Sequence, residues 1–117
     1  MKLPHGEYLH FAKDLVEHTE KYIVVDCSFP MIPTLAMFLE AAAQCTAGFE
    51  REENVKMGFL TMGKDIKILN NINKKEYIFK IEKGVHVAEY HQFNFEALCK
   101  ETRVKIVSGT LTLKTEV

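Results

Sequence analysis

Apolar residues recur at about every second position through most of the second half of the chain. The pattern is clear in residues 76–82, 90–99 and 103–113. Alternation of this kind is typical of strands with one face in a core and the other in water. We therefore predict three antiparallel strands there, with turns at residues 83–84 and 100–101, where charged residues interrupt the alternation.

The first half of the chain contains shorter patterns of the same type. Residues 21–29 are rich in β-branched and aromatic side chains and predict a strand. Residues 58–69 also predict a strand, because apolar and charged positions alternate toward its end. Residues 8–17 mix apolar and polar side chains and fit either a strand or a helix. The polar residues 70–75 predict a turn.

Residues 32–50 differ from the rest, because they predict one long helix that is apolar on nearly every side. Pro33 suits a first helical position, and Thr34 beside it can cap the helix. Between the ends only Glu40 and Gln44 are strongly polar. They lie four residues apart and therefore share one face. A helix apolar all round is a buried helix, so a carboxylate within it must be paired, protonated or functional.

The predicted order is two strands, the apolar helix and four further strands. One helix cannot connect the strands of a parallel sheet of that size, so an antiparallel sheet that covers the helix is the simpler packing. We therefore predict an α+β fold. With 117 residues, the chain is expected to form a single domain over residues 1–117.

Composition and charge exclude several classes of function. The net charge of −1 gives no indication of binding to nucleic acid or to an anionic membrane surface. No apolar run reaches the roughly 18 residues that a membrane-spanning helix needs, and residues 1–10 lack the apolar core of a signal peptide. We therefore expect a cytoplasmic protein that does not associate with membranes.

The cysteines and histidines give no metal-site pattern. The three cysteines are odd in number and show no CxxC spacing, which is typical of reduced thiols. The five histidines form no recognisable zinc-ligand pattern with them, so we expect neither a metal nor any other cofactor.

Several segments together resemble the 3-hydroxyacyl-acyl-carrier-protein dehydratases. Residues 3–17, with their Pro-His pair, resemble the start of that family, and residues 21–29 resemble its second strand. Residues 33–49 resemble its central helix, with a Glu-Ala-x-Ala-Gln core at residues 40–44, and residues 59–72 look like the strand that follows. The resemblance implies a hot-dog fold, in which a curved antiparallel sheet wraps around one long central helix. It also implies a homodimer, or a higher oligomer of dimers, formed through a sheet edge.

The same resemblance implies a reaction and a site. Family members dehydrate 3-hydroxyacyl thioesters in fatty-acid or related acyl-chain synthesis, with the substrate carried by acyl carrier protein or coenzyme A. A histidine removes the proton α to the thioester, and an acidic residue on the central helix handles the departing hydroxyl. Residue by residue, the resemblance assigns the acid to Glu40, and it assigns substrate binding to Thr34, Leu35, Ala36, Gln44, Ser28 and Phe29.

One position departs from the family pattern. The family places its histidine in a Gly-His-Phe-Pro loop between the second strand and the helix. Here that junction is residues 27–33, Cys-Ser-Phe-Pro-Met-Ile-Pro, which keeps the Phe-Pro pair but has Ser28 where histidine would stand. No histidine occurs between His18 and His86. The usual catalytic base is therefore missing from this chain.

Three functions follow as alternatives. The first is a dehydratase-like lyase. The second is a thioesterase that hydrolyses acyl-CoA or acyl groups bound to acyl carrier protein, in which the carboxylate of Glu40 activates water without a histidine. The third is a non-catalytic acyl-binding or dimerisation module, in which Glu40 is a structural carboxylate bonded to Gln44 or across the dimer.

Other reactive or charged side chains have simpler explanations. Cys27 near the helix start could serve as a substitute nucleophile, but an ordinary thiol at a strand end is the favoured interpretation. His86 and His91 lie by a predicted hairpin, where exposure to solvent accounts for them. A solvated hairpin face likewise accounts for four lysines that could otherwise contact an acidic carrier protein, namely Lys74, Lys75, Lys80 and Lys83.

Overall fold

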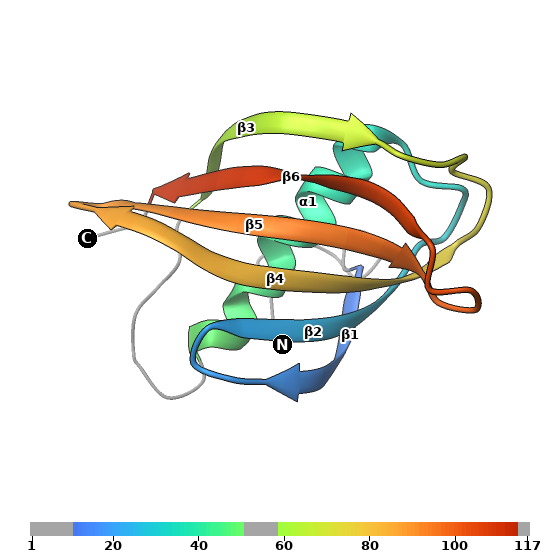
Figure 1. The fold of residues 1–117 in the computed structure, drawn as a ribbon, viewed down its shortest axis with the longest axis horizontal. Helices are drawn as coiled ribbons and strands as arrows, with labels where there is room; N and C mark the ends of the chain where they lie inside the picture. Colours follow the sequence, from blue (N-terminus) through green and yellow to red (C-terminus); the bar gives the residue numbers. More distant parts are fainter. Residues whose placement is uncertain (1–10, 51–58, 115–117) are drawn as a thin grey trace.

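The computed structural model describes residues 11–50 and 59–114, which form six strands, one α-helix and one short 3-10 helix (Figure 1). In chain order the elements are β1 (Ala12–His18), β2 (Tyr22–Ser28), α1 (Leu35–Cys45), the 3-10 helix η2 (Thr46–Glu50), β3 (Phe59–Ile68), β4 (Glu76–Val87), β5 (Tyr90–Cys99) and β6 (Lys105–Lys114).

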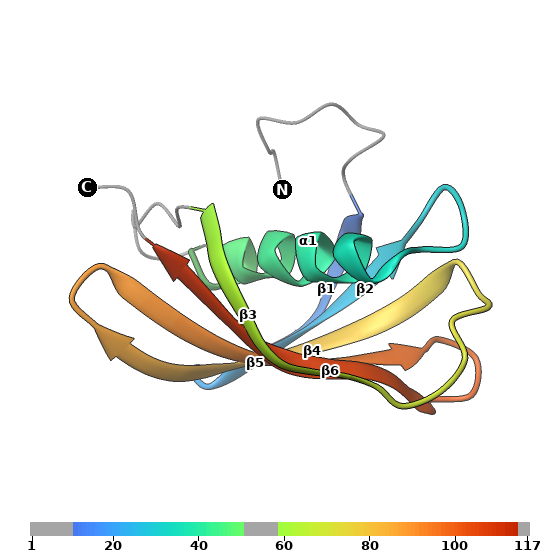
Figure 2. The same cartoon turned by 90° about the horizontal axis from the view of Figure 1, so that it is seen from above.

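All six strands belong to one sheet, in the order β1-β2-β4-β5-β6-β3. Each neighbouring pair is antiparallel. The sheet is strongly curved, and α1 lies across its concave side (Figure 2). The predicted α+β architecture, a curved antiparallel sheet around one central helix, is therefore confirmed.

Residues 83–84 do not form the predicted turn, because β4 continues through them as far as Val87. The register between β4 and β5 shifts between Lys83 and His86, where the alternation of apolar and polar residues is interrupted. A Cβ atom on Gly84 would lie 3.1 Å from the backbone oxygen of Gln92, so the glycine permits a close approach of two strands. The chain reverses instead at residues 88–89, whereas the predicted turn at residues 100–101 is confirmed.

The start and end of the helix also differ from the prediction for residues 32–50. The α-helix covers Leu35–Cys45, and the chain then tightens into the 3-10 turns of η2. The N-cap is Thr34, whose hydroxyl accepts a hydrogen bond of 3.2 Å from the backbone N–H of Met37. Pro33 consequently precedes the cap and is not the first helical residue. The capping role of Thr34 is confirmed.

The core lies between α1 and the concave face of the sheet. The ring of Phe38 packs against Tyr77 and Phe79, with ring centroids 4.9 Å and 5.8 Å apart. The other buried α1 side chains point the same way, and they are Ala41, Ala42, Gln44 and Cys45. Apolar positions of β2, β4, β5 and β6 complete this core.

The opposite face of α1 is partly exposed to solvent. Ala36 is exposed, and Glu40 and Ala43 are half-buried. The prediction that this helix is buried on all sides is therefore wrong for the described chain, because the sheet covers only one side of it (Figure 2). No helix within residues 11–50 and 59–114 has the length and apolar character needed to cross a membrane.

Candidate functional site

Glu40 lies in the middle of α1, on the helix face turned away from the core. Its side chain is half-buried, and its Oε1 atom lies 3.5 Å from the side-chain nitrogen of Gln44. One turn earlier on the same face is Ala36, which is exposed and carries only a methyl group. Because residues four apart are neighbours on a helix, Glu40 has a small residue on its N-terminal side and Gln44 on its C-terminal side.

Two buried hydrogen bonds from the backbone fix the direction of the Gln44 side chain. Gln44 is only 4% exposed, and its side-chain oxygen accepts hydrogen bonds from the backbone N–H groups of Phe11 at 2.8 Å and Ala12 at 3.3 Å. Because the oxygen is held by these two donors, the amide nitrogen is left to point toward Glu40. The predicted proximity of Glu40 and Gln44 is confirmed. The anchoring at Phe11 and Ala12 has no signal in the sequence, since it joins residues more than 30 positions apart.

The N-terminus of α1 places hydrogen-bond donors at the helix end that precedes Glu40. Backbone N–H groups in the first turn, such as those of Leu35 and Ala36, have no acceptor within the helix and carry part of the positive end of its dipole. Ala36 and Glu40 are separated by about 6 Å along the helix axis. A carbonyl oxygen bound at these amides would therefore lie within reach of the Glu40 carboxylate. The Thr34 hydroxyl is engaged in capping, through its bond with Met37.

The connection between β2 and α1 is anchored at its start. The backbone N–H of Ser28 donates to the carbonyl of Phe11, and that of Phe29 donates to the carbonyl of Lys75, each at 2.9 Å. The ring of Phe29 is 3% exposed and packs on Phe11 at a centroid distance of 4.8 Å. Phe29 thus belongs to the core and also packs against Phe38 of α1, at a centroid distance of 5.5 Å. The contact of Ser28 and Phe29 with a substrate stays a prediction.

Cys27 is placed unfavourably for nucleophilic catalysis. It is completely buried, and its sulfur lies 3.5 Å from that of Cys45, which is also buried. Burial raises the pKa of the Cys27 thiol well above its ordinary value, and the hydrogen bond with Cys45 raises it further. A thiol without solvent access that stays protonated is a core residue, so the structure favours the ordinary-thiol interpretation.

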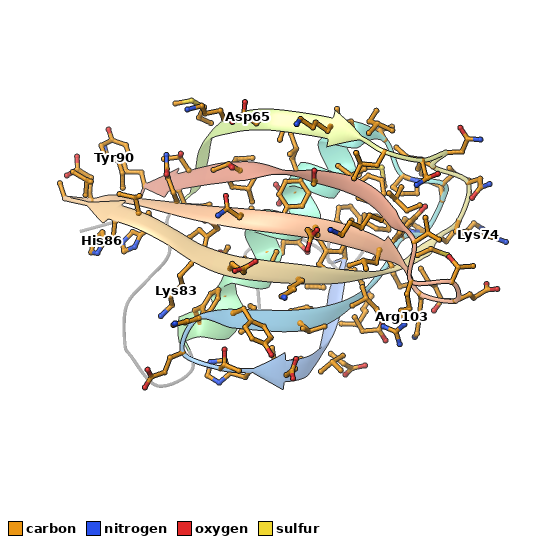
Figure 3. The ribbon with its side chains drawn as sticks, in the orientation of Figure 1. Asp65, Lys74, Lys83, His86, Tyr90 and Arg103 are labelled. Atoms are coloured by element: carbon orange, nitrogen blue, oxygen red, sulfur yellow. The ribbon has the colours of Figure 1, made fainter. Side chains whose placement is uncertain are left out.

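A separate surface cavity of about 330 Å³ lies between the β3–β4 connection and the end of β5. It is lined by Asn70, Asn71, Asn73, Lys74, Tyr77, Cys99, Thr102, Val104 and Ile106. Lys74 and Arg103 mark this end of the molecule in Figure 3. None of the residues predicted for substrate binding lines the cavity, so it is distinct from the surface around Glu40.

Comparisons with known proteins agree with this architecture. The chain matches no protein-family model and has no significant match among curated proteins. Among solved structures it is similar to the dehydratase heterocomplex ApeI:P from Xenorhabdus doucetiae, with a TM-score of 0.75 at 14% identity over 98% of this chain and 88% of that one. A hypothetical thioesterase protein with coenzyme A from Streptococcus pneumoniae gives 0.66 at 10% identity, over 88% and 84% of the two chains.

A third similar structure is the HP0420 homologue from Helicobacter felis, with a TM-score of 0.68 at 12% identity over 97% of this chain and 82% of that one. The TM-scores establish a common fold, whereas sequence identities this low leave the reaction open. Together with the sheet order and the position of α1, these similarities show that the chain has the hot-dog fold.

Proposed function

We propose that this protein acts on acyl thioesters, carried by acyl carrier protein or coenzyme A in the cytoplasm, and that Glu40 is its acid–base group. The observation that carries this proposal is the arrangement on the outer face of α1. There the amides of Leu35 and Ala36 lie one turn before the Glu40 carboxylate, which has the anchored Gln44 side chain beside it.

The proposed reaction is the dehydration of a 3-hydroxyacyl thioester, or its reverse. The helix N-terminal amides bind the thioester carbonyl and stabilise the negative charge that develops on its oxygen when the α proton is removed. Glu40 then donates a proton to the departing hydroxyl, or orients the water in the reverse direction. Gln44 is a positioning residue, because its amide reaches the substrate only through Glu40.

The α proton must go to a base from outside the β2–α1 connection, which contains no histidine. We propose that a second subunit packs over the open face of α1 and supplies this base. The similar structure from Xenorhabdus doucetiae is described as a dehydratase heterocomplex, which supports an assembly of two different chains as well as a homodimer.

Thioester hydrolysis is the second candidate, and the missing histidine favours it. Hydrolysis needs one carboxylate to activate water and donors for the carbonyl oxygen, and the outer face of α1 offers both. The similarity to a hypothetical thioesterase protein with coenzyme A supports the same interpretation.

Two assays of the purified full-length chain separate these reactions. One measures the hydration of trans-2-enoyl thioesters of several chain lengths, and the other measures thiol release from saturated acyl-CoA. Glu40→Gln is expected to lower the active reaction by about 10²–10⁴-fold while leaving the fold intact, which is the range for a lost acid–base group. Glu101→Gln, at an exposed carboxylate in the β5–β6 turn, is the matched control and should keep full activity.

Failure of both assays has a defined meaning. Binding of an acyl-CoA that requires an intact α1 N-terminus, without turnover, would support the acyl-binding module instead. Neither turnover nor binding at high protein concentration, alone or with a co-purified partner chain, would overturn the proposal. Unchanged turnover by Glu40→Gln would remove Glu40 from the mechanism.

A further inference from the structure

The end of the β4–β5 hairpin carries two histidines in direct contact, far from Glu40 in the sequence and not used by the proposed reaction. His86 on β4 and His91 on β5 are cross-strand partners. Their rings are stacked with centroids 3.9 Å apart and planes tilted by 16°. Figure 3 places His86 near Tyr90 at the free end of this hairpin.

The register explains why the two rings are so close. The loop has two residues, and Val87 and Tyr90 form the pair that closes it. In a two-residue hairpin the closing pair is hydrogen bonded, so the next pair, His86 and His91, is a non-hydrogen-bonded one. Pairs of this kind have the shorter Cα–Cα separation, about 4.5 Å, which brings their side chains together.

A hydrogen bond fixes the protonation pattern of His86. Its Nε2 atom lies 2.9 Å from the carbonyl oxygen of Ala88 in the turn. A carbonyl only accepts, so Nε2 carries the hydrogen, and in the neutral ring the lone pair is on Nδ1. A ring N–H held by a backbone carbonyl is the usual support of a metal-binding histidine, because it sets the tautomer and raises the basicity of the other nitrogen.

His91 is also held in the form that binds metals. It is half-buried, and its ring is stacked on that of Phe93 at a centroid distance of 6.5 Å. Burial lowers the pKa of His91, and the neighbouring His86 and Lys83 lower it further. The direction of this shift favours the neutral imidazole, which is the form with a lone pair for a metal ion.

We propose that His86 and His91 form a two-histidine site for a borderline divalent transition-metal ion, of the class Ni²⁺, Cu²⁺ and Zn²⁺, at the tip of the β4–β5 hairpin. Imidazole suits these ions, whereas Mg²⁺ and Ca²⁺ prefer oxygen ligands. Binding turns the two rings from their stacked arrangement until one lone pair from each meets the ion, and water completes the coordination. The proposal does not depend on the reaction at Glu40.

The site has two protein ligands in the described structure. No group of three or more metal-ligating His, Cys, Asp or Glu side chains lies together within residues 11–50 and 59–114. Affinity should therefore follow the general order for imidazole sites, with Cu²⁺ bound more tightly than Ni²⁺ or Zn²⁺. The charge of Lys83, which acts on His91, opposes a cation at this position.

Isothermal titration calorimetry of the untagged full-length protein with NiCl₂ tests the site directly. We expect one Ni²⁺ per chain, loss of this binding in both His86→Asn and His91→Asn, and tighter binding in Lys83→Gln. His18→Asn is the matched control, because His18 is an exposed histidine on β1 outside the pair, and it should bind as the wild type does. MgCl₂ should give no heat of binding.

A second measurement reports on the ligand atoms themselves. In histidine-selective ¹⁵N NMR, diamagnetic Zn²⁺ should shift Nδ1 of His86 and one ring nitrogen of His91, leaving His18 unchanged. Binding should also weaken in acidic solution, because protons compete for the imidazole lone pairs. Retention of wild-type affinity by His86→Asn or by His91→Asn, or absence of saturable binding by the wild type, would overturn the proposal.

Discussion

The side-chain oxygen of Gln44 accepts a hydrogen bond of 2.8 Å from the backbone N–H of Phe11, 33 residues earlier in the chain. The bond is buried, and Ala12 donates to the same oxygen. One glutamine thus attaches the central helix to the start of β1 and leaves its amide nitrogen for Glu40. Backbone groups at the edge of the sheet thus orient the glutamine that lies beside Glu40 on the helix.

Replacing Gln44 by methionine should destabilise the protein. The thioether fills a similar volume but leaves the N–H groups of Phe11 and Ala12 without their acceptor in a buried position. We expect the free energy of unfolding in urea to fall by about 1–3 kcal/mol, the cost of an unsatisfied buried polar group. Asn71→Ala, at an exposed amide in the β3–β4 connection, should change it by less than about 0.5 kcal/mol. Equal stability of the two variants would mean that the buried hydrogen bonds to Gln44 do not stabilise the protein.

Removing the N-cap of α1 should weaken the helix start. The hydroxyl of Thr34 accepts a hydrogen bond from the N–H of Met37, so Thr34→Ala should lower the free energy of unfolding by about 1 kcal/mol. Thr34→Ser keeps the hydroxyl and should retain most of the stability. If Thr34→Ser were as unstable as Thr34→Ala, the cap would not be the cause. A loss of thioester binding in Thr34→Ala beyond its loss of stability would indicate that the helix N-terminus also contacts substrate.

A glycine on β6 should be required for packing at the β3 edge. A Cβ atom on Gly109 would collide with Ile66 and would lie 3.0 Å from a ring carbon of Phe95. Gly109→Ala should therefore cost about 1–3 kcal/mol of stability, the usual cost of overpacking, and its melting temperature should fall. The matched control is Gly63→Ala, whose Cβ would lie 3.5 Å from the same Ile66 side chain in ordinary contact.

A double-mutant cycle assigns this cost to the contact. Ile66→Ala removes the terminal carbons that a Cβ at Gly109 would meet. The double variant should therefore be less destabilised than the sum of the two single ones. Additive losses would mean that the collision with Ile66 is not the source of the effect.

Of the three cysteines, Cys99 should react first with a disulfide reagent. It is 6% exposed, whereas Cys27 and Cys45 are completely buried. It also lines the cavity at the end of β5, and hydrogen bonding from the side chain and backbone of Thr102 lowers its pKa. The thiolate fraction is therefore larger at neutral pH than for an ordinary thiol, and the rate should fall only as the pH drops through this lowered pKa. Stopped-flow thiol titration of the native protein measures this rate.

Variants assign the fast reaction to its side chain. Cys99→Ser should remove the fast phase, and Thr102→Val should slow it at neutral pH because the pKa of Cys99 then rises. Cys27→Ser should leave it unchanged, since the Cys27 thiol is buried and its pKa is raised. A fast phase that survives in Cys99→Ser would show that another thiol is the accessible one.

Much of the fold could be predicted from the sequence because its elements are encoded locally. Strands β2, β5 and β6 were expected within a few residues of their observed bounds, because a two-residue period or a β-branched run identifies each of them. The prediction was wrong at Gly84, where the sequence resembles a turn but the approach of β5 requires a glycine within a strand. A local pattern cannot distinguish these two uses of glycine.

The candidate site was predictable only in part. The four-residue spacing of Glu40 and Gln44 placed them on one helix face, and this is confirmed. The sequence also indicated a helix buried all round, whereas the sheet covers one side and leaves the Glu40 face open. Which side of an apolar helix is covered depends on how the sheet curves, and no residue within the helix encodes that.

The sequence by itself determined most of the elements, their order and the chemistry available on α1, because periodicity and side-chain type are local properties. For residues 8–17 it left strand and helix open, and pairing with β2 makes β1 a strand. Only the tertiary structure decided which distant groups meet. The hydrogen bond from Phe11 directs Gln44, and the register of one hairpin stacks His86 on His91. These contacts arise from strand register and sheet curvature, which many weak interactions along the whole chain set together.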